Sequence, residues 1–462
     1  MSIFAARSAR FVCAIALICP DGREEIFGGE IGGFINRGAR GKRGFGYDPL
    51  FFLPERGMTT AELAPAEKNS RESVFQGGEI YKIATMKKTI HIILACAALA
   101  AAGFAQSVNE SGWGKTKDGT PVKLFTLKND KGMAVEITNY GGRIVKIVVP
   151  DRDGKPGDVV LGFDSLAGYE SRDHSYFGAI IGRYGNRIAD GEFSIDGKTY
   201  KLPKNDGGVN HIHGGPSGFD GRVWDAEASA SPKGAVLKLS LVSPDGDQGY
   251  PGTLKAAVTY TLDNSNTLTV NYKATADKPT VCNLTNHSYF NLAGEGRGSV
   301  ANHEVTINAD KFTPVSKKYL IPTGGLKDVE GTPFDFRKPR QVGSRIEADD
   351  AQLQGAGGYD HNWALNKDPK NPKAMTFAAR VYEPVSGREM TVYTTEPGVQ
   401  FYAGNFLKGV KGKGGKQYFF RYGMCFETQH YPDSPNNEDF PSTILRPGET
   451  YDTTTAFRFG AR

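Results

Sequence analysis

Alternating apolar and polar positions dominate the chain from Thr120 onward and predict β-strands. The stretch MAVEITN (133–139) alternates with a period of two and ends before two glycines. RIVKIVV (143–149) alternates in the same way and ends before Asp153-Gly154. No sustained 3.6-residue periodicity competes with this pattern in that region, so the expected elements are strands.

Turn signals divide these runs into hairpins. In GEFSIDGKTYKL (191–202), Asp196-Gly197 stands between two short alternating runs, and in AVTYTLDNSNTLTVNYKATA (257–276) an Asn-Ser-Asn turn does the same. The 58 glycines of the 462-residue chain fit many turns. Such strands continue over roughly 340 residues, far beyond a sandwich of about 100. The pattern therefore predicts an all-β fold, a large antiparallel β-sandwich.

An apolar segment in the middle of the chain breaks the pattern. Met86 opens MKKTIHIILACAALAAAGFAQS, which has a basic head, an apolar run and small residues around Phe104. These are the three parts of a secretory signal peptide, with cleavage after Ala105. The run is shorter than the ~20 residues that span a bilayer. Residues 86–105 are therefore predicted to direct export to the periplasm or beyond. A buried helix, or lipidation at Cys96, are the alternatives.

The segment before Met86 has a different character. It contains RSARFVCAIALICPDGREEIFGGEIGGFI (7–35) and GFGYDP (44–49), which resemble the C-terminal half of the inosine triphosphate pyrophosphatase family. The resemblance implies a partial α/β fold with Phe45 and Asp48 near a purine. The family's phosphate-binding and metal-binding half is missing, and half of an α/β domain cannot cover its own sheet. We expect residues 1–75 to be a truncated, inactive fragment, and residues 76–85 a linker.

Charge and cysteine content exclude several classes of function. The net charge is only +5 and no long Lys/Arg run occurs, so no nucleic-acid partner is expected. None of the five cysteines has metal-ligand spacing, and no metal is expected. Only Cys282 and Cys425 lie within residues 106–462. Two buried, unpaired thiols are the preferred interpretation, with a disulfide between them left open.

Polar strings interrupt the strands in a fixed order. They are GRYGNRI (182–188), HIHGG (211–215), NHSYFNLAG (286–294), GYDHNW (358–363), EPGVQFYAGNF (396–406) and FETQHYPDSPN (426–436). In order and spacing they resemble the aldose 1-epimerase (galactose mutarotase) family across nearly all of residues 106–462. The resemblance implies the galactose mutarotase-like supersandwich and the interconversion of the α and β anomers of free aldoses.

This chemistry needs one base and one acid and no cofactor. The base removes the proton of the anomeric hydroxyl while the acid protonates the ring oxygen, so the ring opens and closes on the other face. The site should raise the pKa of a carboxyl toward the working range and keep an imidazole protonated. By resemblance, Glu427 is the base and His287 is the acid. Without the motifs, Glu427 would be a solvated strand carboxylate and His287 a core histidine.

The resemblance also implies a set of sugar-binding residues: Asn186, Arg187, His213, Asp360 and Gln400. The alternatives are a surface arginine, an Asx turn at Asp360 and a solvent-facing strand residue at Gln400. His211, two residues before His213, is expected to be structural and to share its strand face if the segment is extended. Tyr289, Phe290, Trp363 and Tyr402 could stack on a sugar, but aromatics in strands are more often core, and none is assigned.

The sequence thus predicts an exported aldose 1-epimerase acting on monosaccharides such as glucose and galactose. No stable membrane association is expected after cleavage of the signal peptide. One alternative is a non-catalytic carbohydrate-binding sandwich, in which Glu427 and His287 would be dispensable. The other is an epimerase for sugar phosphates, which should show a basic cluster around the pocket.

Overall fold

The computed structural model describes residues 8–18, 24–35, 40–41, 50–53, 57–63, 106–171 and 176–462. The chain divides into two compact units, Met1–Ala101 and Ala102–Arg462. The predicted linker 76–85, the signal peptide 86–105, Cys96, Phe45 and Asp48 lie outside the described residues. Those predictions therefore stay predictions.

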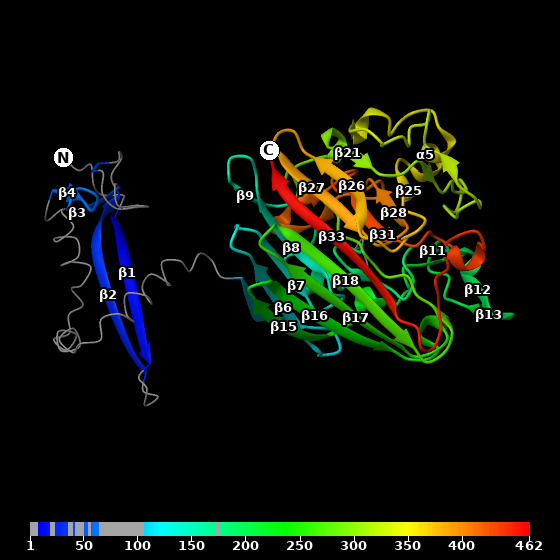
Figure 1. Ribbon diagram of the computed structural model, residues 1–462, viewed down its shortest axis with the longest axis horizontal. Coiled ribbons are helices and arrows are strands. Elements are labelled where there is room, and N and C mark those ends of the chain that lie inside the picture. Colours follow the sequence, from blue (N-terminus) through cyan, green and yellow to red (C-terminus); the bar gives the residue numbers. More distant parts are fainter. Residues whose placement is uncertain are drawn as a thin grey trace. The chain divides into compact units, whose positions relative to one another are not determined.

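The first unit contains a four-stranded antiparallel sheet (Figure 1). Its strands are β1 (Ser8–Ile18), β2 (Glu24–Ile35), β3 (Phe51–Leu53) and β4 (Met58–Thr59). Phe51, Leu53 and Leu63 form a small buried cluster beside β3. The described residues of this unit lie mainly in strands and do not test the predicted partial α/β fold.

The second unit is built from antiparallel sheets, which confirms the predicted all-β class (Figure 1). The largest sheet has nine strands in the order β15 (Asp225–Ser231), β16 (Gly234–Ser243), β17 (Leu254–Leu262), β18 (Thr267–Ala276), β33 (Tyr451–Ala461), β27 (Arg388–Thr394), β26 (Thr376–Tyr382), β21 (Glu304–Ile307) and β24 (Arg340–Gln341). A five-stranded sheet follows chain order: β5 (Ser107–Lys115), β6 (Pro121–Lys128), β7 (Ala134–Thr138), β8 (Ile144–Pro150) and β9 (Pro156–Asp158). A second five-stranded sheet has the order β23 (Lys327–Asp328), β22 (Lys311–Phe312), β25 (Asp360–Ala364), β28 (Gly398–Tyr402) and β31 (Cys425–Gln429).

The described residues of the second unit also contain short strand pairs, two short α-helices and several 3-10 turns. The pairs are β10 (Ile180–Ile181) with β20 (Thr285–Asn286), β11 (Arg187–Ile188) with β14 (His211–Ile212), β12 (Glu192–Ile195) with β13 (Lys198–Lys201), β19 (Thr280–Val281) with β32 (Ile444–Leu445), and β29 (Val410–Lys411) with β30 (Gln417–Tyr418). The helices are α4 (Leu166–Tyr169) and α5 (Ala351–Ala356). Within the described residues, no helix is long and apolar enough to cross a membrane.

One hydrophobic core joins the three large sheets. It combines alternate residues of β6, β7 and β8 with those of β16, β17 and β18 and with the inward faces of β25, β28 and β31. In β17 every second side chain, from Leu254 to Leu262, is buried, as the period-two pattern predicts. Burying one face of each sheet against the others removes apolar area from water and fixes the register of the strands.

Both predicted hairpins form. Asp196 and Gly197 have φ values of 50° and 78° and connect Ile195 to its cross-strand partner Lys198. Positive φ at both turn positions matches the right-handed twist of the flanking strands, and an Asp-Gly pair tolerates it. β17 and β18 pair from Leu262–Leu268 outward around the Asn-Ser-Asn turn. Cys282 and Cys425 are both buried and unpaired, as preferred from the sequence.

Candidate active site

Three neighbouring strands form the floor of the site. In the β25–β28–β31 register, Asn362 lies opposite Gln400, and Gln400 lies opposite Glu427. Because side chains alternate along a strand, these residues share one face with Asp360 and Cys425. The other face carries Trp363, Phe401 and Phe426, which belong to the main core. One face of the sheet therefore carries a row of polar side chains, and the other face packs against the main core.

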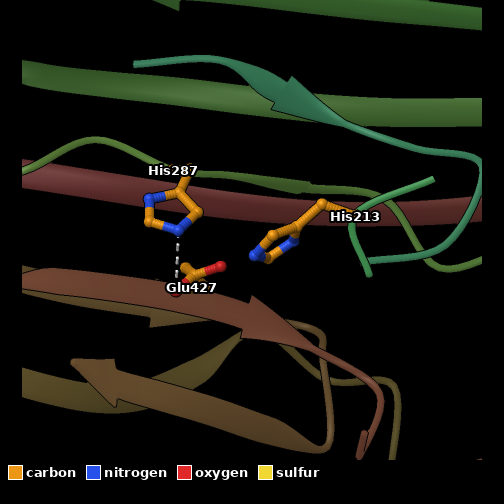
Figure 2. A group of neighbouring side chains, drawn as sticks. All are labelled: His213, His287 and Glu427. Carbon is orange, nitrogen blue, oxygen red and sulfur yellow. Dashed lines mark ion pairs between the residues drawn. The ribbon is translucent and has the colours of Figure 1, made fainter. Parts of the chain in front are cut away.

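His287 lies across from Glu427, beside this row of polar side chains. It follows β20 directly, and its backbone N–H donates to the carbonyl of Ala179 at 2.9 Å, while its own carbonyl accepts from Gly178 at 3.0 Å. The Nε2 atom of His287 lies 3.7 Å from Oε1 of Glu427, and both side chains are buried (Figure 2). The structure thus brings together the predicted acid and base.

His213 approaches the pair from a third segment. Its φ is 51°, so the chain turns after β14 instead of continuing as a strand, and the prediction of a shared face with His211 does not hold. Figure 2 shows its ring directed toward His287 and Glu427. The backbone N–H of Asn186 donates to Nδ1 of His213 at 3.2 Å. Nδ1 is therefore the acceptor, and the neutral ring carries its proton on Nε2.

His211 is structural, as expected. It is fully buried, with Nδ1 2.8 Å from the carbonyl oxygen of Pro203 and Nε2 2.7 Å from the hydroxyl of Tyr250. Both ring nitrogens thus have partners other than His287 and Glu427.

Arg187 and Asn186 are held in place by short contacts. The Nε atom of Arg187 lies 2.9 Å from Oδ2 of Asp206, and the side chain of Arg187 is 12% exposed. Asn186 is buried, and its Oδ1 accepts from the backbone N–H of Arg187 at 2.9 Å. The arginine is therefore oriented rather than freely solvated, which disfavours the surface-arginine alternative.

Asp360 and Gln400 form a hydrogen-bonded pair. Nε2 of Gln400 donates to Oδ1 of Asp360 at 2.7 Å. Gln400 is 3% exposed, so it is not a solvent-facing strand residue. Asp360 begins β25, and its carboxylate accepts from a neighbouring strand, which is different from the Asx turn considered as its alternative. The pair places a carboxylate and an amide next to Glu427, and both groups can form hydrogen bonds with hydroxyls.

Burial determines where the proton lies in the Glu427–His287 pair. It raises the pKa of Glu427 well above its usual 4.5, an effect strengthened by the charge of Asp360 and opposed by Arg187. Burial also lowers the pKa of His287 to about 3. The expected rise of the carboxyl pKa is present, whereas the expectation that the site keeps the imidazole protonated is wrong for the free protein. The reason is that a dry pocket disfavours both charges, so the shared proton resides on Glu427.

The same three residues have metal-binding chemistry. Within the described part of the chain, ligand atoms of His213, His287 and Glu427 all lie within 4.8 Å of one another. Two imidazoles and a carboxylate could hold a divalent transition metal. Proton transfer accounts for the cluster without an ion, and the expectation of a metal-free enzyme stays a prediction.

Several site residues were not assigned from the sequence. Asn362 and Gln429 are fully buried on the polar face, and their side-chain amides have no hydrogen-bond partner among the described residues. Each lies two positions from an assigned residue, Asp360 or Glu427, so period-two alternation could have found them. Of the four unassigned aromatics, Phe290 and Trp363 lie in the main core, whereas Tyr289 and Tyr402 pack in a second cluster.

Two tyrosines enclose the ring of His287. Tyr289 stacks on it with centroids 5.1 Å apart and planes inclined by 21°. Tyr176 stacks on it at 5.8 Å and 27°, and also contacts the ring of His213 at 4.7 Å. Tyr176 lies outside all six polar strings, so the motifs gave no signal for it.

A buried carboxyl–imidazole pair on a β-sandwich, with further polar groups beside it, defines a site suited to acid–base chemistry. The family model described as aldose 1-epimerase matches residues 123–458, and the chain belongs to that family. The galactose mutarotase of Bos taurus is 49% identical over 339 residues, covering 73% of this chain and 94% of the relative. The aldose 1-epimerase of Escherichia coli K12 is 41% identical over 344 residues, covering 74% and 96%.

Solved structures agree with this membership. The galactose 1-epimerase from Lactobacillus acidophilus superposes with a TM-score of 0.67 at 32% identity, covering 77% of this chain and 99% of that one. An aldose epimerase homologue from C. elegans gives a TM-score of 0.65 at 31% identity, covering 73% and 98%. A separate match, to the Ham1 family, covers residues 1–74, the segment with the pyrophosphatase-like strings.

Proposed function

We propose that this protein is an isomerase that interconverts the α and β anomers of free aldoses, with glucose and galactose as substrates. The observation that carries the proposal is the 3.7 Å approach of His287 Nε2 to Glu427 Oε1, both buried, beside the Asp360–Gln400 pair. Membership of the aldose 1-epimerase family supports the reaction, and the galactose mutarotase relatives support the sugar.

The pair can complete the reaction with a single shared proton. In the ionic form, Glu427 takes the proton of the anomeric hydroxyl while Nε2 of His287 protonates the ring oxygen, and the C1–O5 bond breaks to give the aldehyde. The pair is now neutral, with the proton on Glu427. After rotation about C1–C2, Glu427 returns a proton to the aldehyde oxygen, His287 regains the proton of the C5 hydroxyl, and the ring closes on the other face. Atoms and protons balance over the cycle.

In the free protein, the pair is in its neutral form, with the proton on Glu427. This is the form that catalyses ring closure. Burial favours the neutral pair, and the ion pair needed for opening differs from it only in which residue holds the proton. The negative charge that develops on Glu427 lies within the influence of Arg187, which lowers its pKa. The Nε2–H of His213 points into the same space and can donate to a sugar oxygen on which negative charge develops.

The remaining polar groups would fix the sugar in the site. The Asp360–Gln400 pair can bind adjacent hydroxyls, one as acceptor and one through its amide. Arg187 offers further donors beside Asp206. Holding the ring at several hydroxyls keeps C1 and O5 against the base and the acid while the open aldehyde rotates.

The two alternative functions have less support. A carbohydrate-binding sandwich has no need for a buried carboxyl whose Oε2 atom has no hydrogen-bond partner among the described residues, an arrangement that costs stability. A sugar-phosphate site needs cations free to meet a dianion. Here Arg187 is already paired with Asp206, and the charge of Asp360 would repel the phosphate.

Polarimetry on fresh α-D-glucose and α-D-galactose tests the proposal. The wild-type protein should relax the optical rotation faster than buffer. Glu427→Gln and His287→Asn should each lower kcat by about 10²- to 10⁴-fold, the range for lost general acid–base catalysis. Glu227→Gln makes the same chemical change at an exposed side chain and should behave as wild type. If all four proteins relax the rotation no faster than buffer, the proposal is lost for these sugars.

We also propose export by the segment Met86–Ala105, on the strength of its basic head, apolar run and small residues before Gln106. The enzyme would then act on free sugars outside the cytoplasm.

A further inference from the structure

Cys425 lies directly behind the catalytic imidazole. Its Sγ atom is 3.5 Å from Nδ1 of His287, within the range of a hydrogen bond to sulfur, and both side chains are buried. β31 places Cys425 two residues before Glu427, so both side chains project from the same face of the sheet. Two side chains of one strand therefore lie beside the two ring nitrogens of His287: Glu427 beside Nε2 and Cys425 beside Nδ1.

The two ring nitrogens of His287 have different roles in proton transfer. Nε2 faces Glu427 and has to gain and lose a proton in each cycle. Nδ1 then has to keep its proton throughout, because a neutral imidazole with its proton on Nε2 could not accept one from the sugar there. A ring that retains Nδ1–H in a buried pocket needs an acceptor at Nδ1.

The stacked tyrosines do not choose between the two ring orientations. Tyr289 and Tyr176 lie against the faces of His287 and hold its plane, but a half-turn that exchanges Nδ1 and Cδ2 leaves both stacking contacts in place. Only a polar partner at the ring edge distinguishes these states. Among the described side chains, Cys425 is the one with a hydrogen bond to Nδ1 of His287.

We propose that Cys425 is a positioning residue: its sulfur accepts a hydrogen bond from Nδ1–H of His287 and thereby holds the tautomer and orientation in which Nε2 exchanges protons. The inference rests on the proposed epimerase function and adds a residue to its site. The role corresponds to the carboxylate behind the histidine of a catalytic triad, with an uncharged acceptor in its place.

An uncharged partner suits this site. Burial raises the pKa of the Cys425 thiol well above its usual range, and the charges of Glu427 and Asp360 raise it further, so the sulfur stays a neutral thiol. A carboxylate at this position would stabilise the imidazolium and make it a weaker acid toward the ring oxygen. The thiol orients the ring without adding that stabilisation.

The main-chain carbonyl of His287 is the competing acceptor. Its hydrogen bond raises the pKa of His287 against the larger effect of burial. If that carbonyl alone held the tautomer, removal of the sulfur would change neither the tautomer nor the rate. The two explanations therefore predict different results for the same variant.

Substitutions at Cys425 in the full-length protein test the inference. Cys425→Val fills similar volume without an acceptor, Cys425→Ala removes the sulfur with less bulk, and Cys425→Ser keeps a hydrogen-bonding group. Cys282→Ala is the matched control, because Cys282 is the other buried free thiol among the described residues and packs in the main core. The readouts are kcat and KM by polarimetry, the melting temperature, and the His287 tautomer by ¹⁵N NMR of histidine-labelled protein.

We expect Cys425→Val and Cys425→Ala to lower kcat about five- to tenfold with KM unchanged, the scale of one lost neutral hydrogen bond. The Nδ1–H tautomer of His287 should lose its dominance in both. Cys425→Ser should recover most of the rate and the tautomer, and Cys282→Ala should match wild type. The inference is overturned if Cys425→Val folds, keeps the wild-type kcat and retains Nδ1–H. An inactive wild-type protein would instead reject the proposed function.

Discussion

Nε2 of His287 lies 3.7 Å from Oε1 of Glu427, although the two residues are far apart in the chain, His287 following β20 and Glu427 lying within β31. Both are buried, and their pKa values move in opposite directions, that of the carboxyl upward and that of the imidazole downward to about 3. The pair therefore holds one proton over a wide range of pH.

The first prediction concerns the pH dependence of kcat/KM. Activity needs one proton on the pair, so it should fall at acid pH as His287 gains a proton, with a midpoint near its pKa of about 3. It should fall at alkaline pH as Glu427 loses its proton, at a pH above its usual 4.5. Polarimetry corrected for the uncatalysed reaction measures both limbs. An acid limb centred near the ordinary histidine value of about 6.5 would contradict the neutral resting imidazole.

The second prediction is that Asp360→Asn shifts the alkaline limb toward lower pH. The charge of Asp360 is the second cause, after burial, of the raised pKa of Glu427. Removing that charge lowers the pKa of Glu427, so its proton is lost earlier on the alkaline side. Gln400→Ala removes the hydrogen-bonded neighbour of Asp360 without removing a charge, and its alkaline limb should stay closer to that of wild type. Identical limbs in Asp360→Asn and wild type would argue against this coupling.

The third prediction links Glu427 to stability. A carboxyl whose folded-state pKa is raised stabilises the fold below its unfolded pKa, and this contribution is lost as pH rises through the folded pKa. Glu427→Gln cannot ionise, so its Tm should exceed that of wild type at alkaline pH, by about 1–3 °C for a domain of this size. The difference should shrink toward pH 4. Calorimetry at both pH values measures it, with Glu227→Gln as the exposed control. A difference that does not vary with pH would mean that Glu427 is not the titrating group.

The fourth prediction concerns export. Protein recovered from outside the cytoplasm should begin at Gln106, because the small residues before it satisfy a signal-peptidase site. Mass spectrometry of the intact protein locates the N-terminus. Ala105→Arg should block cleavage and leave the segment attached. Recovery of an exported protein that still carries residues 1–85 would refute this assignment.

The sequence by itself determined many of the strands and, through ordered motifs, the candidate site residues. Period-two alternation predicted β7 and β8 to within one or two residues, and Asp196-Gly197 predicted its hairpin, because burial of one sheet face and the twist of a two-residue turn restrict residue choice locally. Ordered motifs assigned Glu427 and His287, and the structure brings both into one site.

Only the tertiary structure decided the protonation of that site and the groups behind it. Burial of His287 comes from segments that meet only after folding, so its low pKa could not be inferred from the residues beside it in the chain. Cys425 reaches Nδ1 of His287 across 138 residues of sequence. His213 turns into the site through a positive φ, a conformation that the residues around it in the sequence did not indicate. Side-chain alternation is a local property that sequence encodes directly, whereas desolvation and hydrogen-bond partners sum over contacts from distant segments that only the packed fold brings together.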